Sequence, residues 1–86
     1  MAKLPTARPQ RRTSPEKAFG QTLRNIRESR NLSQEELGAR SGYHRTYIGQ
    51  LERGEKSPSL RTVFDLCSTL KVKPWILVRR IEEIVN

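Results

Sequence analysis

The side chains best suited to chemistry in this chain are hydrogen-bond donors and cations gathered between positions 45 and 53. On a helical wheel of about 100° per residue, Tyr47, Ile48 and Leu51 fall on one side. The other side has uncharged polar and cationic residues and no acid: Arg45, Thr46, Gly49, Gln50 and Arg53. Such a face suits hydrogen bonding to an anionic partner.

Catalytic and metal-binding chemistry lack the residues they need. The chain has one His, His44, and one Cys, Cys67, so neither a nucleophile–base pair nor a zinc site can be assembled from them. Glu35 and Glu36 belong to a helix cap and its surface rather than to a catalytic carboxylate pair. We therefore expect no enzymatic activity, no metal and no cofactor.

Size and charge narrow the class of partner. The 86 residues make one domain with a modest core, and the formal net charge of +8 favours nucleic acid first and an anionic membrane second. A single cysteine excludes an internal disulfide and fits a reducing cytoplasm. No apolar run is long enough for a signal peptide or a membrane span, so we expect a cytoplasmic protein without a membrane partner.

The chain divides into a tail, residues 1–14, and a domain, residues 15–86. The tail holds Lys3, Arg8, Arg11 and Arg12 and no acid, and it has too little apolar surface to offset the entropy of ordering. We therefore interpret it as a flexible basic arm. It either touches DNA phosphates or a minor groove, or is simply a solvated tail.

Every segment of the domain has the pattern of a helix, and none has that of a strand. Capping and stop residues mark the ends of five helices. The first begins at Thr13 or Ser14 and ends at Asn31, the second lies between Ser33 and Gly42, and the third lies between His44 and Gly54. Ser59 marks the start of the fourth helix and Pro74 the start of the fifth. The sequence therefore predicts an all-α fold.

Apolar spacing in the last two helices separates core from surface. The fourth helix has Val63, Leu66, Cys67 and Leu70 at helical spacing, which makes Cys67 a core residue. The fifth has an apolar stripe of Leu77, Val78, Ile81, Ile84 and Val85. Trp75 and Ile76 project elsewhere, which indicates an interface. The alternative is that Trp75 folds back into the core.

Several spaced motifs carry a family resemblance. They are the run Leu32-Ser33-Gln34-Glu35-Glu36-Leu37, then Ser41-Gly42, then Tyr47-Ile48-Gly49-Gln50-Leu51-Glu52-Arg53-Gly54. Together they resemble the Cro/repressor-type (Xre-like) helix-turn-helix family over about residues 16–78. The resemblance implies a five-helix repressor-like DNA-binding domain with its helix-turn-helix centred on residues 34–53.

The resemblance also implies a role for individual residues. The base-contacting positions match Arg45, Thr46 and Gln50, whose side chains suit guanine, thymine and adenine edges. Gln34 matches a phosphate contact at a helix N-terminus. We expect further backbone contacts from Tyr43, His44, Arg53 and Lys56. Arg27 and Glu52 match an ion pair that ties the first helix to the third.

Several positions depart from the family pattern, among them Trp75 and Ile76, where family members are often polar. Gly38 stands where the family usually has Ala, in the second helix where it meets the third, and glycine within a helix costs ~1 kcal/mol relative to alanine. His44 stands where the family usually has Ser or Thr as a cap, and histidine caps less well. The start of the third helix could therefore differ by one residue.

These features predict a sequence-specific transcriptional regulator, a repressor or autoregulator, that binds a pseudo-palindromic operator in double-stranded DNA as a homodimer. Trp75 and Ile76 are the candidate dimer contacts. One alternative is the DNA-binding antitoxin of a toxin–antitoxin pair, and another is a protein-interaction module without base readout. The chain has no separate ligand domain, so we expect no small-molecule ligand.

Overall fold

The computed structural model describes residue 11 and residues 13–86. Most of the predicted basic arm, residues 1–10 and 12, lies outside the described residues. Residues 13–86 form five helices and no strand. The helices are α1 (Pro15–Ser29), α2 (Gln34–Ser41), α3 (Arg45–Glu52), α4 (Leu60–Leu70) and α5 (Pro74–Val85). The predicted all-α fold is confirmed, and none of these helices is long and apolar enough to cross a membrane.

Local signals account for the ends of the helices. Ser14 is the cap of α1, because its hydroxyl accepts the backbone N–H of Lys17 at 3.1 Å, which decides between the two predicted starts. The capping box of Ser33 and Glu36 forms as expected, and its hydrogen bonds lower the pKa of the Glu36 carboxyl. Gly42 ends α2 in the left-handed region, with φ of 84°.

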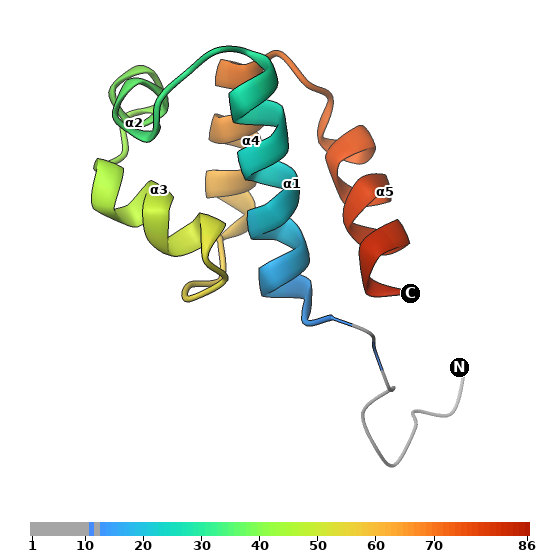
Figure 1. The fold of residues 1–86 in the computed structure, drawn as a ribbon. Helices are drawn as coiled ribbons and strands as arrows, with labels where there is room; N and C mark the ends of the chain where they lie inside the picture. Colours follow the sequence, from blue (N-terminus) through green and yellow to red (C-terminus); the bar gives the residue numbers. More distant parts are fainter. Residues whose placement is uncertain (1–10, 12) are drawn as a thin grey trace.

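The core lies around α1, which packs against α3 and α5, while α4 packs against α2 and α5. Figure 1 shows α2 and α3 on one side of α1 and α5 on the other. The largest fully buried side chains come from all five helices: Leu23, Leu37, Ile48, Leu51, Leu66, Leu70, Leu77, Thr22 and Cys67. Cys67 is therefore a core residue as predicted, and burial raises the pKa of its thiol.

Burial at two positions does not follow from the sequence pattern. Val78 lies on the apolar stripe of α5 yet is 54 % exposed. The reason is that α5 packs mainly along α1 and meets α4 less extensively, so only Leu77 and Val85 on this helix are fully buried. Gly49, assigned to the outer face of α3, is buried beneath the side chains of Gln34 and Arg53.

Gly38 allows the two short helices of the helix-turn-helix to cross. It is buried in α2, and a Cβ built on it would overlap the backbone carbonyl oxygen of Tyr43 and lie 3.3 Å from the backbone nitrogen of Arg45. Backbone atoms cannot move aside as a flexible side chain can. The glycine is therefore required by close approach, which outweighs its poor helix propensity.

We predict that Gly38→Ala destabilises the protein although alanine favours helices by ~1 kcal/mol. Overpacking costs about 1–3 kcal/mol, and the upper end applies where the obstacle is backbone. Urea unfolding followed by circular dichroism measures the change in unfolding free energy. The control is Ala39→Gly at the exposed neighbouring position, which should lose only the propensity difference. A Gly38→Ala protein more stable than wild type would contradict the close-packing argument.

Candidate nucleic-acid interface

The recognition helix candidate, α3, has a buried and an outward side. Ile48 and Leu51 are 0 % exposed and belong to the core. Arg45 and Thr46 are exposed, and Gln50 is half-buried. The three side chains predicted to contact bases therefore project from a helix whose opposite side is anchored in the core.

His44 is the N-cap of α3, so the helix begins where the sequence placed it. Its Nδ1 accepts the backbone N–H of Thr46 at 3.0 Å. A neutral ring that accepts at Nδ1 carries its proton on Nε2. The exposed ring thus caps the helix and still offers one N–H donor to a partner.

The predicted ion pair of Arg27 and Glu52 is present and nearly buried, with 10 % and 3 % of the two side chains exposed. Arg27 donates from Nε and Nη2 to the two carboxylate oxygens of Glu52 at 2.6 and 3.0 Å. Its Nη1 donates to the carbonyl oxygen of Leu32 at 2.7 Å. The hydrogen bond to Glu52 raises the pKa of Arg27, so this cation stays charged.

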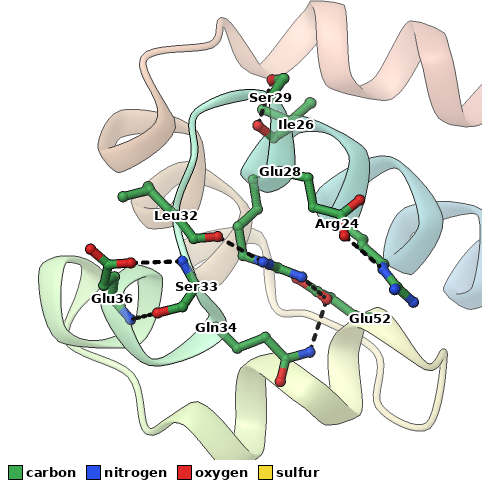
Figure 2. Close-up of polar contacts among 10 residues, drawn as sticks. Arg24, Ile26, Glu28, Ser29, Leu32, Ser33, Gln34, Glu36 and Glu52 are labelled. Carbon is green, nitrogen blue, oxygen red and sulfur yellow. Dashed lines mark hydrogen bonds and ion pairs between the residues drawn. The ribbon is translucent and has the colours of Figure 1, made fainter.

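Gln34 is held by the same carboxylate. Its Nε2 donates to Oε1 of Glu52 at 3.0 Å, across the junction of α2 and α3 drawn in Figure 2. Gln34 is the first residue of α2, where backbone N–H groups lack partners within the helix. The side chain predicted to contact a phosphate is therefore positioned by a buried ion pair, a link that sequence reasoning missed.

Tyr43 has a partner inside the protein. Its hydroxyl donates to Oδ2 of Asp65 on α4 at 2.7 Å, and its ring lies 5.5 Å from that of Tyr47 between centroids. A phenol has one proton to donate. A phosphate contact by Tyr43 would require the bond to Asp65 to break, so the structure gives this residue a role in packing the turn against α4.

The remaining predicted backbone contacts follow the end of α3. Arg53 is the C-cap of α3 and is exposed, as is Lys56 in the next loop. Arg53 donates from Nε to Oε2 of Glu55 at 2.6 Å. This hydrogen bond raises the pKa of Arg53 and lowers that of Glu55.

The candidate dimer residues lie on α5, away from α3. Trp75 is 61 % exposed, so it does not fold back into the core, and Ile76 is half-buried. Sequence reasoning missed two exposed apolar residues on α4, Leu60 at 75 % and Phe64 at 55 %. Their spacing of four residues, offset from the buried stripe of that helix, was a signal that could have revealed them.

With this geometry in place, comparison with known proteins identifies the family. A family model described as helix-turn-helix matches residues 23–74. The chain belongs to this helix-turn-helix family. The matched stretch begins within α1 and ends at the first residue of α5, so it contains the complete helix-turn-helix and α4.

Several relatives are regulators of this family. The uncharacterized HTH-type transcriptional regulator y4dJ of Sinorhizobium fredii is 36% identical over 78% of this chain and 87% of its own. Control protein C.BamHI of Bacillus amyloliquefaciens is 44% identical over 65% of this chain and 70% of its own. The crystal structure of the restriction-modification controller protein C.AhdI from Aeromonas hydrophila has a TM-score of 0.69 at 41% identity, covering 71% of this helix-turn-helix chain and 92% of that one.

We predict that Arg27→Met lowers the free energy of unfolding by about 3 kcal/mol, because it leaves the Glu52 carboxylate buried without its cation. Urea unfolding provides the measurement. The matched control is Arg24→Met in the same helix, which breaks an exposed pair with Glu28 (3.3 Å) and should cost less than about 1 kcal/mol. Equal effects of the two substitutions would show that the buried pair does not hold α1 to α3.

Proposed function

We propose that the protein is a sequence-specific transcriptional regulator, a repressor or autoregulator, that binds a pseudo-palindromic operator as a homodimer. The observation that carries this proposal is the outward side of α3, where Arg45 and Thr46 are exposed while Ile48 and Leu51 are fixed in the core. A helix anchored in this way can present side chains to base edges in the major groove.

The expected contacts follow from the arrangement of α2 and α3. With α3 in the major groove, α2 lies across the sugar–phosphate backbone. Arg45, Thr46 and Gln50 would read bases. Phosphate contacts would come from the N-terminus of α2 with Gln34, and from other exposed donors that border α3: Nε2 of His44, Arg53 and Lys56.

The relatives support a regulatory role. C.BamHI is a control protein, and C.AhdI is a restriction-modification controller. Sequence identity of 41–44% to such proteins favours control of transcription by operator binding. It does not favour the two alternatives considered from the sequence, an antitoxin and a protein-interaction module. No feature of the described helices favours either alternative.

The dimer face proposed here is wider than the sequence indicated. Phe64 and Pro74 line one groove of about 400 Å³ formed by α4 and the segment that leads into α5, and Lys71 and Lys73 line it too. Val78 lies one helical turn beyond Pro74 on the same side, and Trp75 follows Pro74 directly. Exposed apolar side chains of this kind are costly in a monomer, and a second copy of the chain would cover them.

Selection of bound sequences from random DNA tests the function. We predict a palindromic consensus whose half-sites are about one helical turn, ~34 Å, apart. Arg45→Ala and Gln50→Ala should each relax preference at particular base pairs, by about 1–3 kcal/mol of discrimination. Gln34→Ala should weaken binding to all sequences alike. Binding without any consensus would refute sequence-specific regulation, and no binding would favour the protein-interaction module.

We further predict that Phe64→Glu and Trp75→Ala each yield a folded monomer with weaker operator binding, because buried aromatic anchors often contribute ~2 kcal/mol or more to an interface. Sedimentation velocity reports the association state, and circular dichroism reports folding. Gln21→Glu, at an exposed position of α1, is the control and should stay dimeric. Variants that all remain dimeric would place the interface elsewhere.

A further inference from the structure

Both arginines at the ends of α3 have a carboxylate partner from a flanking segment. Nη1 of Arg45, the first residue of α3, lies 3.6 Å from Oε2 of Glu35 on α2. At the other end, Arg53 donates from Nε and Nη2 to Glu55 at 2.6 and 3.4 Å. These two arginines are the ones expected to contact a base and the phosphate backbone, respectively.

Stability alone does not account for these pairs. The four side chains are between 52% and 75% exposed, and exposed ion pairs contribute little to folding. Carboxylates beside a DNA-binding helix also repel phosphates, so Glu35 and Glu55 oppose binding by their charge. Glu35 lies in the first turn of α2, where a carboxylate favours the helix, whereas Glu55 has no such place. A benefit to recognition would offset the repulsion at both positions.

The geometry of each pair suits the contact expected of its arginine. Glu35 lies at ion-pair distance from Nη1 of Arg45, 3.6 Å, without a hydrogen bond. This leaves the edge formed by Nε and Nη2, which presents two parallel donors as O6 and N7 of guanine require. Glu55 accepts hydrogen bonds from Nε and Nη2 of Arg53, which leaves Nη1 for another partner. Nη1 lies over Gly49, and a Cβ built on that glycine would be 3.1 Å from it. A single remaining nitrogen suits one phosphate oxygen.

We propose that Glu35 and Glu55 are positioning residues, which orient Arg45 for reading one base and Arg53 for holding the backbone. An unrestrained arginine loses much rotamer freedom on binding, and a side chain already oriented loses less. An oriented Arg45 is also kept from swinging onto a neighbouring phosphate, so Glu35 adds to sequence preference. Orientation of Arg53 by Glu55 offsets part of the charge repulsion and leaves sequence preference unchanged. This inference rests on the proposed function.

The two carboxylates should differ in what their removal changes. Glu35→Gln removes a negative charge, which strengthens binding to any DNA, and it also frees Arg45. Preference at the base pair that Arg45→Ala relaxes should therefore fall by about two- to tenfold, the range for ordering one such side chain. Glu55→Gln should leave every base preference unchanged, since the phosphate backbone is the same at all sequences.

The experiment uses the 86-residue protein. It measures affinity for the selected operator, for operators altered at one base pair, and for random duplex of equal length. Glu28→Gln is the matched control, because it makes the same charge change in an exposed Glu–Arg pair within α1. It should raise affinity for all duplexes alike. In the Arg45→Ala background, Glu35→Gln should cause no further loss of base preference.

Glu35→Gln would overturn the proposal if its base preferences matched those of Glu28→Gln, because charge alone would then explain the effect. A loss of base preference with Glu55→Gln equal to that with Glu35→Gln would do the same. Failure of the proposed function is distinguishable, because it would appear in wild-type protein as binding without a consensus. Arg45→Ala without effect on any base pair would overturn the role of Glu35 and leave the regulator function intact.

Discussion

The buried ion pair of Arg27 and Glu52 is the interaction on which the arrangement of the proposed DNA-binding surface depends. The two arms of the helix-turn-helix, α2 and α3, have eight residues each, too few to be stable helices in isolation. Glu52 connects α3 to α1 through Arg27 and to α2 through Gln34. One carboxylate therefore connects the outward helix to α1 and fixes the side chain proposed to contact a phosphate.

Carboxylates on this surface lie beside its arginines and hold them in defined orientations. The charge of Arg27 is balanced by Glu52 in the interior. Arg45 and Arg53 lie at opposite ends of α3, each beside a carboxylate. A net charge of +8 supplies general attraction to a polyanion, which does not discriminate between sequences. Discrimination requires donors at defined positions, and the pairs with Glu35 and Glu55 provide a physical means of holding them.

The face proposed for DNA and the face proposed for dimerisation are connected through α4. Tyr43, in the turn before α3, donates a hydrogen bond to Asp65, and α4 also carries the exposed Leu60 and Phe64. Movement of α4 in a dimer would therefore shift Tyr43 and, with it, the start of α3. Two recognition helices must be separated by about one turn of DNA, so a firm connection of this kind serves the spacing.

Sequence alone determined whatever depends on residues a few positions apart: the five helices, the capping box of Ser33 and Glu36, the stop at Gly42 and the division of α3 into two sides. The pairing of Arg27 with Glu52 came from family resemblance, because 25 residues separate them and no local rule predicts such a contact. Tertiary structure decided the rest. Val78 and Phe64 are exposed because α5 packs mainly along α1, Gly38 is required because the backbone of the turn approaches it, and Tyr43 contacts Asp65 because α2 packs on α4. These outcomes depend on how helices pack against one another, which the spacing of residues within a single helix does not specify.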